Sequence, residues 1–191
     1  MLMKIVSTEK ENKQKLINTI HDYFECFLVY CFLGWCYESI WCDVIYHKRG
    51  FLNRGVLFGP WLPIYGFGFF IILGIFALLK VKKPWLVFIV GGIIATLSEL
   101  VASYILEAAM GNYMWDYTGY FMNFDSRIAL VPGLMFGLLI CVAICCIHPA
   151  IVRFQNKYRS SKIHKICFMI ITALFVCDLI SRIWLGSNFS G

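Results

Sequence analysis

The sequence predicts an all-α, polytopic helical membrane protein with about five transmembrane helices. Hydrophobic residues fill 60% of the 191 positions, charged residues fill only 15%, and the mean hydropathy is +0.74. A soluble domain of this length has too little interior to hide so large an apolar excess. The apolar residues also fall in runs of roughly 20, the length of a membrane-crossing helix. A soluble globular domain and a secreted disulfide scaffold are therefore excluded.

The N-terminal segment, residues 1–22, is expected to be cytoplasmic and amphipathic. Leu16, Ile17, Ile20 and Phe24 recur at helical spacing and Lys13 and Lys15 directly precede them, a pattern typical of a helix lying among lipid headgroups. No small-residue cleavage site follows the first apolar run, so this segment is not expected to be a signal peptide.

The transmembrane domain is expected over residues 23–186, followed by a short external tail at 187–191. Its five predicted spans cover residues 23–46, 56–79, 85–110, 128–152 and 166–185. Most of the 17 Lys and Arg residues lie before the first span, in the second connection or in the fourth. The positive-inside rule then predicts a multi-pass protein of the cell membrane with a cytoplasmic N-terminus and an external C-terminus. Lys48, Arg49 and Arg54 run against this bias.

The net charge of +6 has a simple explanation in this bias and in attraction to anionic lipid, so the lipid bilayer is the expected partner and nucleic acid is not. The nine cysteines all lie in or at the edge of predicted spans, without a CxxC pair or a histidine at zinc-site spacing. They are expected to pack as small hydrophobic residues, and no metal or other cofactor is expected. The four histidines fall near span ends and are expected to be interfacial anchors.

Ionisable residues inside the predicted spans are costly to insert and usually face a partner or a cavity. They are Glu38, Asp43, Glu99, Glu107, Asp178 and Arg182. Asp178 and Arg182 are four residues apart and are expected to pair along their own helix. Asp43 and Glu107 lie near the outer ends of spans, where a headgroup contact suffices. Glu38 and Glu99 lie deeper, and the candidate cations for them are Arg54 and Arg127.

Two interpretations remain open for the glycine- and proline-rich residues 53–68. Pro60 and Pro63 interrupt a regular helix, so this stretch reads as a re-entrant or broken segment before the second helix. The alternative is a tight loop with GxxxG helix packing, which residues 55–59 and again 133–137 would provide.

The long outer loop at residues 111–127 is rich in aromatic side chains, as expected of an interfacial belt. Asp116 and Arg127 could instead close over the region of Glu38 and Arg54 like a lid. The candidate binding residues of a polar cavity are thus Glu38, Arg54, Tyr65, Glu99, Asp116 and Arg127.

Four segments carry a family resemblance: GWCYES around Glu38, NRGVLFGPWLPIYGFG, SELVASYILE around Glu99, and WDY followed by RI. Together they resemble the bacterial putative ABC-transporter type IV (CmpB-like) integral membrane proteins, from about residue 32 to residue 148. The chain departs from this pattern at FDSRI, where an Asn-Gly-Arg-like turn is expected, and at VPGLMFG. The resemblance implies a permease subunit.

Three functions remain as alternatives. The first is a transport component with an ATP-binding subunit in trans, because the chain has no GxxxxGK[ST] loop of its own. Five spans are few for one channel, so a homodimer would enclose the path, and residues 153–165 would offer the coupling surface. The second is an intramembrane lipid- or isoprenoid-modifying enzyme, although HExxH, GxSxG and aspartate-rich metal motifs are absent. The third is a non-catalytic structural or regulatory subunit.

Overall fold

The structure, a computed structural model, describes residues 2–40, 50–55, 57–112 and 115–185, with side chains from residue 12 onward except 110 and 185. The structure is 77% helical, and no strand occurs in the described ranges. The predicted fold class, a helical membrane protein, is confirmed. The predictions for Cys42, Asp43, His47, Lys48, Arg49 and the tail at 187–191 concern residues outside the described ranges.

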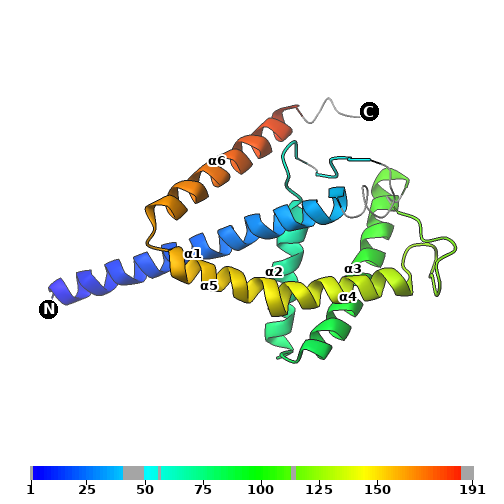
Figure 1. Cartoon of the computed structure of the whole chain (residues 1–191), viewed down its shortest axis with the longest axis horizontal. Coiled ribbons are helices and arrows are strands. Elements are labelled where there is room, and N and C mark those ends of the chain that lie inside the picture. The colour runs from blue at the N-terminus through cyan, green and yellow to red at the C-terminus, as the bar shows by residue number, and fades with distance from the viewer. Residues whose placement is uncertain (1, 41–49, 56, 113–114, 186–191) are drawn as a thin grey trace. The chain divides into compact units, whose positions relative to one another are not determined.

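The chain forms two compact units, which we describe separately. The first comprises Met1–Phe69 with Arg153–Gly191, and the second comprises Phe70–Val152. The helices in chain order are α1 (Leu2–Cys36), α2 (Pro63–Leu78), α3 (Pro84–Met110), α4 (Leu130–Val142), the π-helical η2 (Ala143–Ile147), α5 (His148–Tyr158) and α6 (Lys162–Leu185) (Figure 1).

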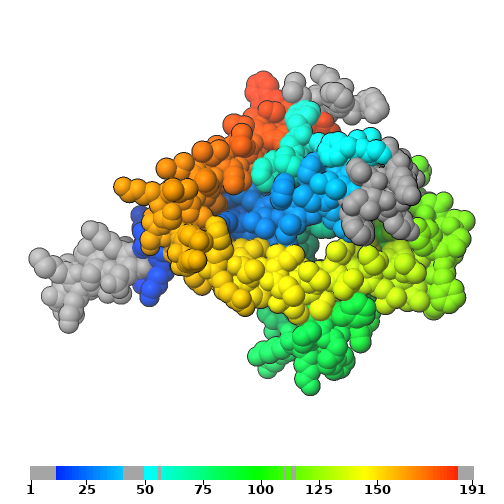
Figure 2. Space-filling view, viewed as in Figure 1, coloured from blue at the N-terminus to red at the C-terminus, as the bar shows by residue number. Residues whose placement is uncertain are grey.

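Three helical stretches are long and apolar enough to cross a membrane: Pro84–Ala109, Leu130–Tyr158 and Lys162–Trp184. They coincide with the predicted third, fourth and fifth spans, and α2 is a shorter apolar helix. In the most apolar stretch of α6, only 6% of the residues are buried. Figure 2 shows the orange and red α6 on the surface, and its exposed large apolar side chains suit a lipid-facing surface.

The α1 helix is a single continuous element from Leu2 to Cys36, so the predicted amphipathic segment and the start of the first span form one helix (Figure 1). A π-helical turn at residues 37–40 follows it. Leu16, Ile17 and Ile20 are exposed along α1, as the amphipathic pattern predicts.

The break before α2 is confirmed, because residues 50–55 and 57–62 contain no helix. Pro63 begins α2, a position where its missing N–H group costs no hydrogen bond. The N–H group of Leu62 donates to the carbonyl of Cys31 on α1 at 3.0 Å. Gly55 and Gly59 lie in this non-helical stretch, so the GxxxG packing interpretation is wrong for them.

In the second unit, the GxxxG interpretation is correct for Gly133 and Gly137, which bring α4 against α3. A Cβ atom on Gly137 would lie 2.6 Å from the carbonyl oxygen of Phe88, and one on Gly92 would lie 3.0 Å from that of Gly133. Such distances are too short for a side chain, so the glycines allow the two helix backbones to approach closely.

Candidate functional site

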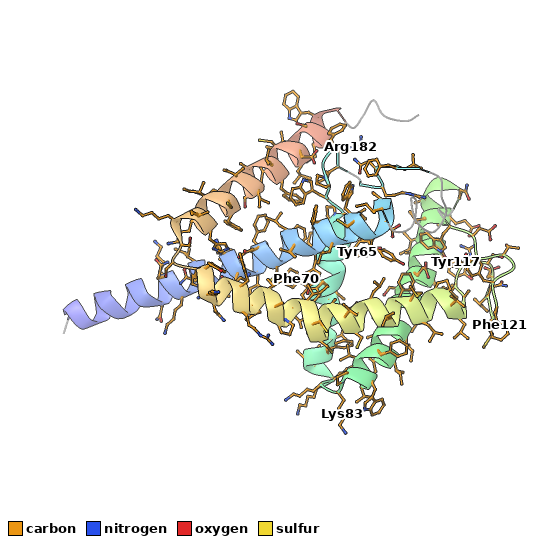
Figure 3. All side chains as sticks on the ribbon, viewed as in Figure 1. Tyr65, Phe70, Lys83, Tyr117, Phe121 and Arg182 are labelled. Carbon is orange, nitrogen blue, oxygen red and sulfur yellow. The ribbon has the colours of Figure 1, made fainter. Side chains whose placement is uncertain are left out.

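Glu38 and Tyr65 form a hydrogen-bonded pair in the first unit. The hydroxyl of Tyr65 donates to Oε1 of Glu38 at 2.6 Å. Glu38 lies in the π-helical turn, a local geometry that is frequent at functional sites because it redirects side chains. Gly34, one turn earlier, leaves the space that the ring of Tyr65 occupies (Figure 3). We call this arrangement the Glu38–Tyr65 pair.

The non-helical stretch before α2, which we call the 50–62 loop, is tied to the end of α1 by side chain to loop contacts. Nε1 of Trp35 donates to Oδ1 of Asn53 at 2.7 Å, and the same oxygen accepts the N–H group of Gly55 at 2.9 Å. The N–H group of Arg54 donates to Oγ of the fully buried Ser39 at 3.0 Å. Two backbone N–H groups of the loop, those of Arg54 and Gly55, are therefore satisfied by protein side chains.

The carboxylate of Asp178 holds the other side of the 50–62 loop. Oδ1 accepts the N–H group of Phe58 at 3.0 Å, and Oδ2 accepts that of Gly59 at 2.7 Å. The guanidinium of Arg182 lies over the ring of Phe58, 5.6 Å from its centroid (Figure 3). The predicted ion pair between Asp178 and Arg182 along α6 is wrong in the part of the chain described, because both side chains serve the loop.

Three of the predicted site residues thus lie in one place. Glu38 and Tyr65 bond directly, and the backbone of Arg54 is fixed to Ser39, the residue after Glu38. The side chain of Arg54 is exposed, while Glu38 and Tyr65 are half-buried. A carboxylate, a phenol and a guanidinium therefore belong to the same end of the first unit.

Glu99, in the second unit, also bonds to a tyrosine. The hydroxyl of Tyr117 donates to its Oε1 at 2.8 Å. Tyr117 comes from the outer loop, and its own N–H group donates to the carbonyl of Ser126 at 2.8 Å. The loop thereby reaches a carboxylate of α3 (Figure 3).

Arg127 connects the same loop to α3 through an ion pair with Glu107, and it forms a second ion pair with Asp125 inside the loop. Its side chain is only 7% exposed, with NH2 2.6 Å from Oε2 of Glu107 and Nε 2.9 Å from Oδ2 of Asp125. The guanidinium also lies 4.2 Å from the ring centroid of Tyr104, and NH1 lies 3.4 Å from Oγ of the buried Ser103. These contacts make Arg127 a fastening point of the loop.

Asp116 shapes a turn in the outer loop. Its Oδ1 accepts the N–H group of Thr118 at 2.8 Å and the hydroxyl of Thr118 at 2.6 Å, and these two hydrogen bonds lower the pKa of Asp116. The pKa of Asp125 is also lowered, chiefly by the hydrogen bond from Arg127 and then by that from Tyr104. The lid predicted over Glu38 and Arg54 would involve both units and stays a prediction.

Sequence reasoning missed a polar cluster in the first unit, which we call the junction cluster. It comprises Asp22 and Glu25 of α1, Gln155 of α5, Arg159 of the turn and His164 of α6. Nε2 of Gln155 donates to the carbonyl of Asp22 at 2.9 Å and to Oε2 of Glu25 at 3.2 Å. Nε2 of His164 lies 2.8 Å from Oε1 of Glu25, and Arg159 pairs with Asp22.

His164 is therefore an interior residue, with 9% of its side chain exposed, and its interpretation as an interfacial anchor is wrong. The signal that could have revealed the cluster is the spacing of Asp22 and Glu25, which share one face of α1. Within the described residues, the cysteines are free and no group of three His, Cys, Asp or Glu side chains could hold a metal ion.

Residues 25–183 match the family described as Putative ABC-transporter type IV, ABC_trans_CmpB. The chain belongs to this family. The match covers most of the chain and continues through α6, beyond the segments that carry the resemblance in the sequence. It includes the Glu38–Tyr65 pair, the 50–62 loop and Asp178. No curated protein and no solved structure matches the chain.

Proposed function

We propose that this CmpB-like protein is a permease component of a solute transporter in the cell membrane. It lacks an ATPase motif of its own and works with an ATP-binding subunit in trans. The family and the apolar helices support a transporter-related membrane protein. In this proposal the N-terminus is cytoplasmic and the C-terminus external, as the distribution of Lys and Arg indicates.

The observation that carries the proposal is the Glu38–Tyr65 pair at the break between α1 and α2. Ionisable side chains are costly to insert into a membrane. Where they occur in membrane segments, they commonly mark the route of a substrate or ion. The hydroxyl of Tyr65 occupies one carboxylate oxygen of Glu38, at 2.6 Å, and fixes the direction of the group. A carboxylate oriented in this way can bind a cation, a proton or a hydrogen-bond donor of a solute.

The 50–62 loop supports the same interpretation. Interrupted helices in transporters place backbone groups and side chains beside the substrate. Here Asp178 and Asn53 hold the interruption in a defined shape, because both accept backbone N–H groups of the loop. A loop held from two sides can present Arg54 next to the Glu38–Tyr65 pair in a reproducible position.

The test is solute uptake in a deletion strain complemented with variants. A panel of labelled amino acids, sugars, peptides, nucleosides and inorganic ions identifies any flux that depends on the protein. We expect Glu38→Gln and Tyr65→Phe to lower that flux at normal membrane abundance, whereas Tyr158→Phe, an exposed tyrosine of α5, leaves it unchanged.

The other two functions would appear as distinct results. Wild-type uptake of every solute by Glu38→Gln, together with an altered lipid profile in the deletion strain, would favour an intramembrane enzyme. Loss of folded protein in Glu38→Gln, with activity per molecule retained, would favour a structural subunit.

A second experiment concerns the partners. We expect purification from native membranes in mild detergent to recover an ATP-binding protein in near-equal amount. Cross-linking in membranes should show a homodimer, because so few helices enclose no path alone. Purification of the chain without an ATP-binding protein would contradict the ATP-driven part of the proposal.

A further inference from the structure

The junction of α1, α5 and α6 carries charge of one sign on its outer surface. Within the described side chains of residues 12–25 and 153–165, the exposed ionic residues are all cationic: Lys13, Lys15, Arg153, Lys157, Lys162 and Lys165. We call this set the junction surface. A basic surface of this kind attracts anionic partners.

The two acidic side chains described in these ranges are turned inward. The side chains of Asp22 and Glu25 are 25% and 14% exposed, and the junction cluster pairs them with Arg159 and His164. Gln155, 3% exposed, adds hydrogen bonds to the same α1 segment. Both carboxylates therefore have their partners inside the junction cluster rather than among the six exposed cations.

Large apolar side chains are interspersed with the cations. Leu16 and Ile20 on α1 are each 60% exposed, Phe154 on α5 is 47% exposed, and Ile163 on α6 is 75% exposed. An acidic protein surface would satisfy the charges and leave these groups poorly matched, whereas a phospholipid bilayer offers anionic phosphates beside acyl chains. The combination of cations and apolar side chains therefore favours a phospholipid bilayer over an acidic protein as the partner of the junction surface.

The position of the junction surface agrees with this choice. One apolar stretch that can cross a membrane ends at Tyr158, and the next begins at Lys162. The cations of residues 153–165 thus lie within two turns of the ends of two such stretches, where lipid headgroups are found. Tyr158 lies beside these cations, with Nζ of Lys157 5.2 Å from its ring centroid. Tyrosine side chains are typical of the headgroup level of a membrane.

We propose that the junction surface binds the headgroups of anionic phospholipids and holds the helical junction at one leaflet. This inference goes beyond transport and does not depend on the Glu38–Tyr65 pair. Each added Lys or Arg near a membrane surface strengthens the attraction to anionic lipid, so six together give a marked preference over neutral lipid.

The test is native mass spectrometry of the purified full-length protein, titrated with phosphatidylglycerol and with phosphatidylcholine of the same acyl chains. We expect wild type to bind phosphatidylglycerol at least about tenfold more tightly. The variant Arg153→Gln/Lys157→Gln/Lys162→Gln/Lys165→Gln should lose most of this preference. The matched control, Lys80→Gln/Lys82→Gln/Lys83→Gln in the turn before α3, should keep most of it, because those lysines lie outside the junction surface.

Thermal unfolding of each variant checks that it is folded, and Lys13→Gln/Lys15→Gln provides a second, smaller variant of the same surface. Equal affinity of wild type for the two lipids would overturn the proposal, as would an equal loss in the control. Retention of the preference by the fourfold variant, together with loss of a soluble acidic partner on purification, would assign the surface to protein docking instead.

Discussion

Asp178 accepts the backbone N–H group of Gly59 at 2.7 Å, across 119 positions of the chain. Its second oxygen accepts the N–H group of Phe58. One carboxylate on α6 therefore satisfies two adjacent donors of the 50–62 loop, which have no helical partners of their own. A carboxylate that binds two backbone N–H groups restrains both the position and the direction of the loop.

We expect Asp178→Ala to release this loop, because two N–H groups lose their acceptor at a cost of about 1–3 kcal/mol each. Asp178→Asn retains one acceptor oxygen and should cost less. Thermal unfolding in detergent and limited proteolysis within residues 50–62 measure the effect. Ser181→Ala, an exposed substitution on the same helix, is the control. Equal stability of Asp178→Ala and wild type would show that the two hydrogen bonds do not hold the loop.

The contact between α3 and α4 gives a second prediction. Gly137→Ala places a Cβ atom 2.6 Å from the backbone oxygen of Phe88, which cannot rotate away as a side chain would. The helices must separate, and overpacking of this kind costs about 1–3 kcal/mol. We therefore expect a lower thermal midpoint for Gly137→Ala.

Gly74→Ala in α2 is the matched control, because a Cβ atom there meets no described atom within 4 Å. In a helix interior alanine is favoured over glycine, so this variant should be as stable as wild type or more so. A fall in midpoint that is equal in the two variants would contradict the close approach of α3 and α4.

These features differ in how far the sequence could predict them. The apolar spans and the break at Pro63 follow from local composition, because hydropathy and proline geometry act on neighbouring residues. The contact of Asp178 with Gly59 could not be predicted, since it depends on which turn of α6 meets the loop. Charge spacing suggested Arg182 as the partner of Asp178 and gave no information on competing backbone donors.

The partner of Arg127 shows the same limit. The sequence offered several carboxylates at comparable distance along the chain, and the structure pairs Arg127 with Glu107 and Asp125. The ion pair with Glu107 depends on which face of α3 meets the loop, and that face carries Ser103, Tyr104 and Glu107. The junction cluster was missed for a related reason, because its members come from three helices and a turn.

Arg127 supports a third prediction. Arg127→Gln removes both ion pairs and the stacking on Tyr104, so the outer loop should detach from α3. Limited proteolysis within residues 115–126 should accelerate on the order of tenfold. Arg127→Lys, which keeps the charge and loses the planar fork, should lie between wild type and Arg127→Gln. An unchanged cleavage rate in Arg127→Gln would mean that other contacts hold the loop.

The outer loop should also respond to acid. The pKa of Asp116 is lowered by the hydrogen bonds from Thr118, and that of Asp125 by the bonds from Arg127 and Tyr104. Each of these carboxyl groups has a pKa in the folded state below its ordinary value of 3.8. Each therefore stabilises the folded state at pH values above 3.8. This contribution disappears as the pH falls through the lower, folded-state value. Loop order should therefore be constant from neutral pH to about pH 4 and decline only below it.

Fluorine NMR of 5-fluorotryptophan at Trp115 reports this change, because its Nε1 donates to the carbonyl of Arg127 at 2.9 Å. We expect the wild-type resonance to shift and broaden only at acid pH. Asp116→Asn/Asp125→Asn should show the loosened environment already at neutral pH and little further change on acidification, since neither amide side chain titrates. A wild-type transition centred well above pH 4 would assign the acid response of the loop to groups other than these two carboxylates.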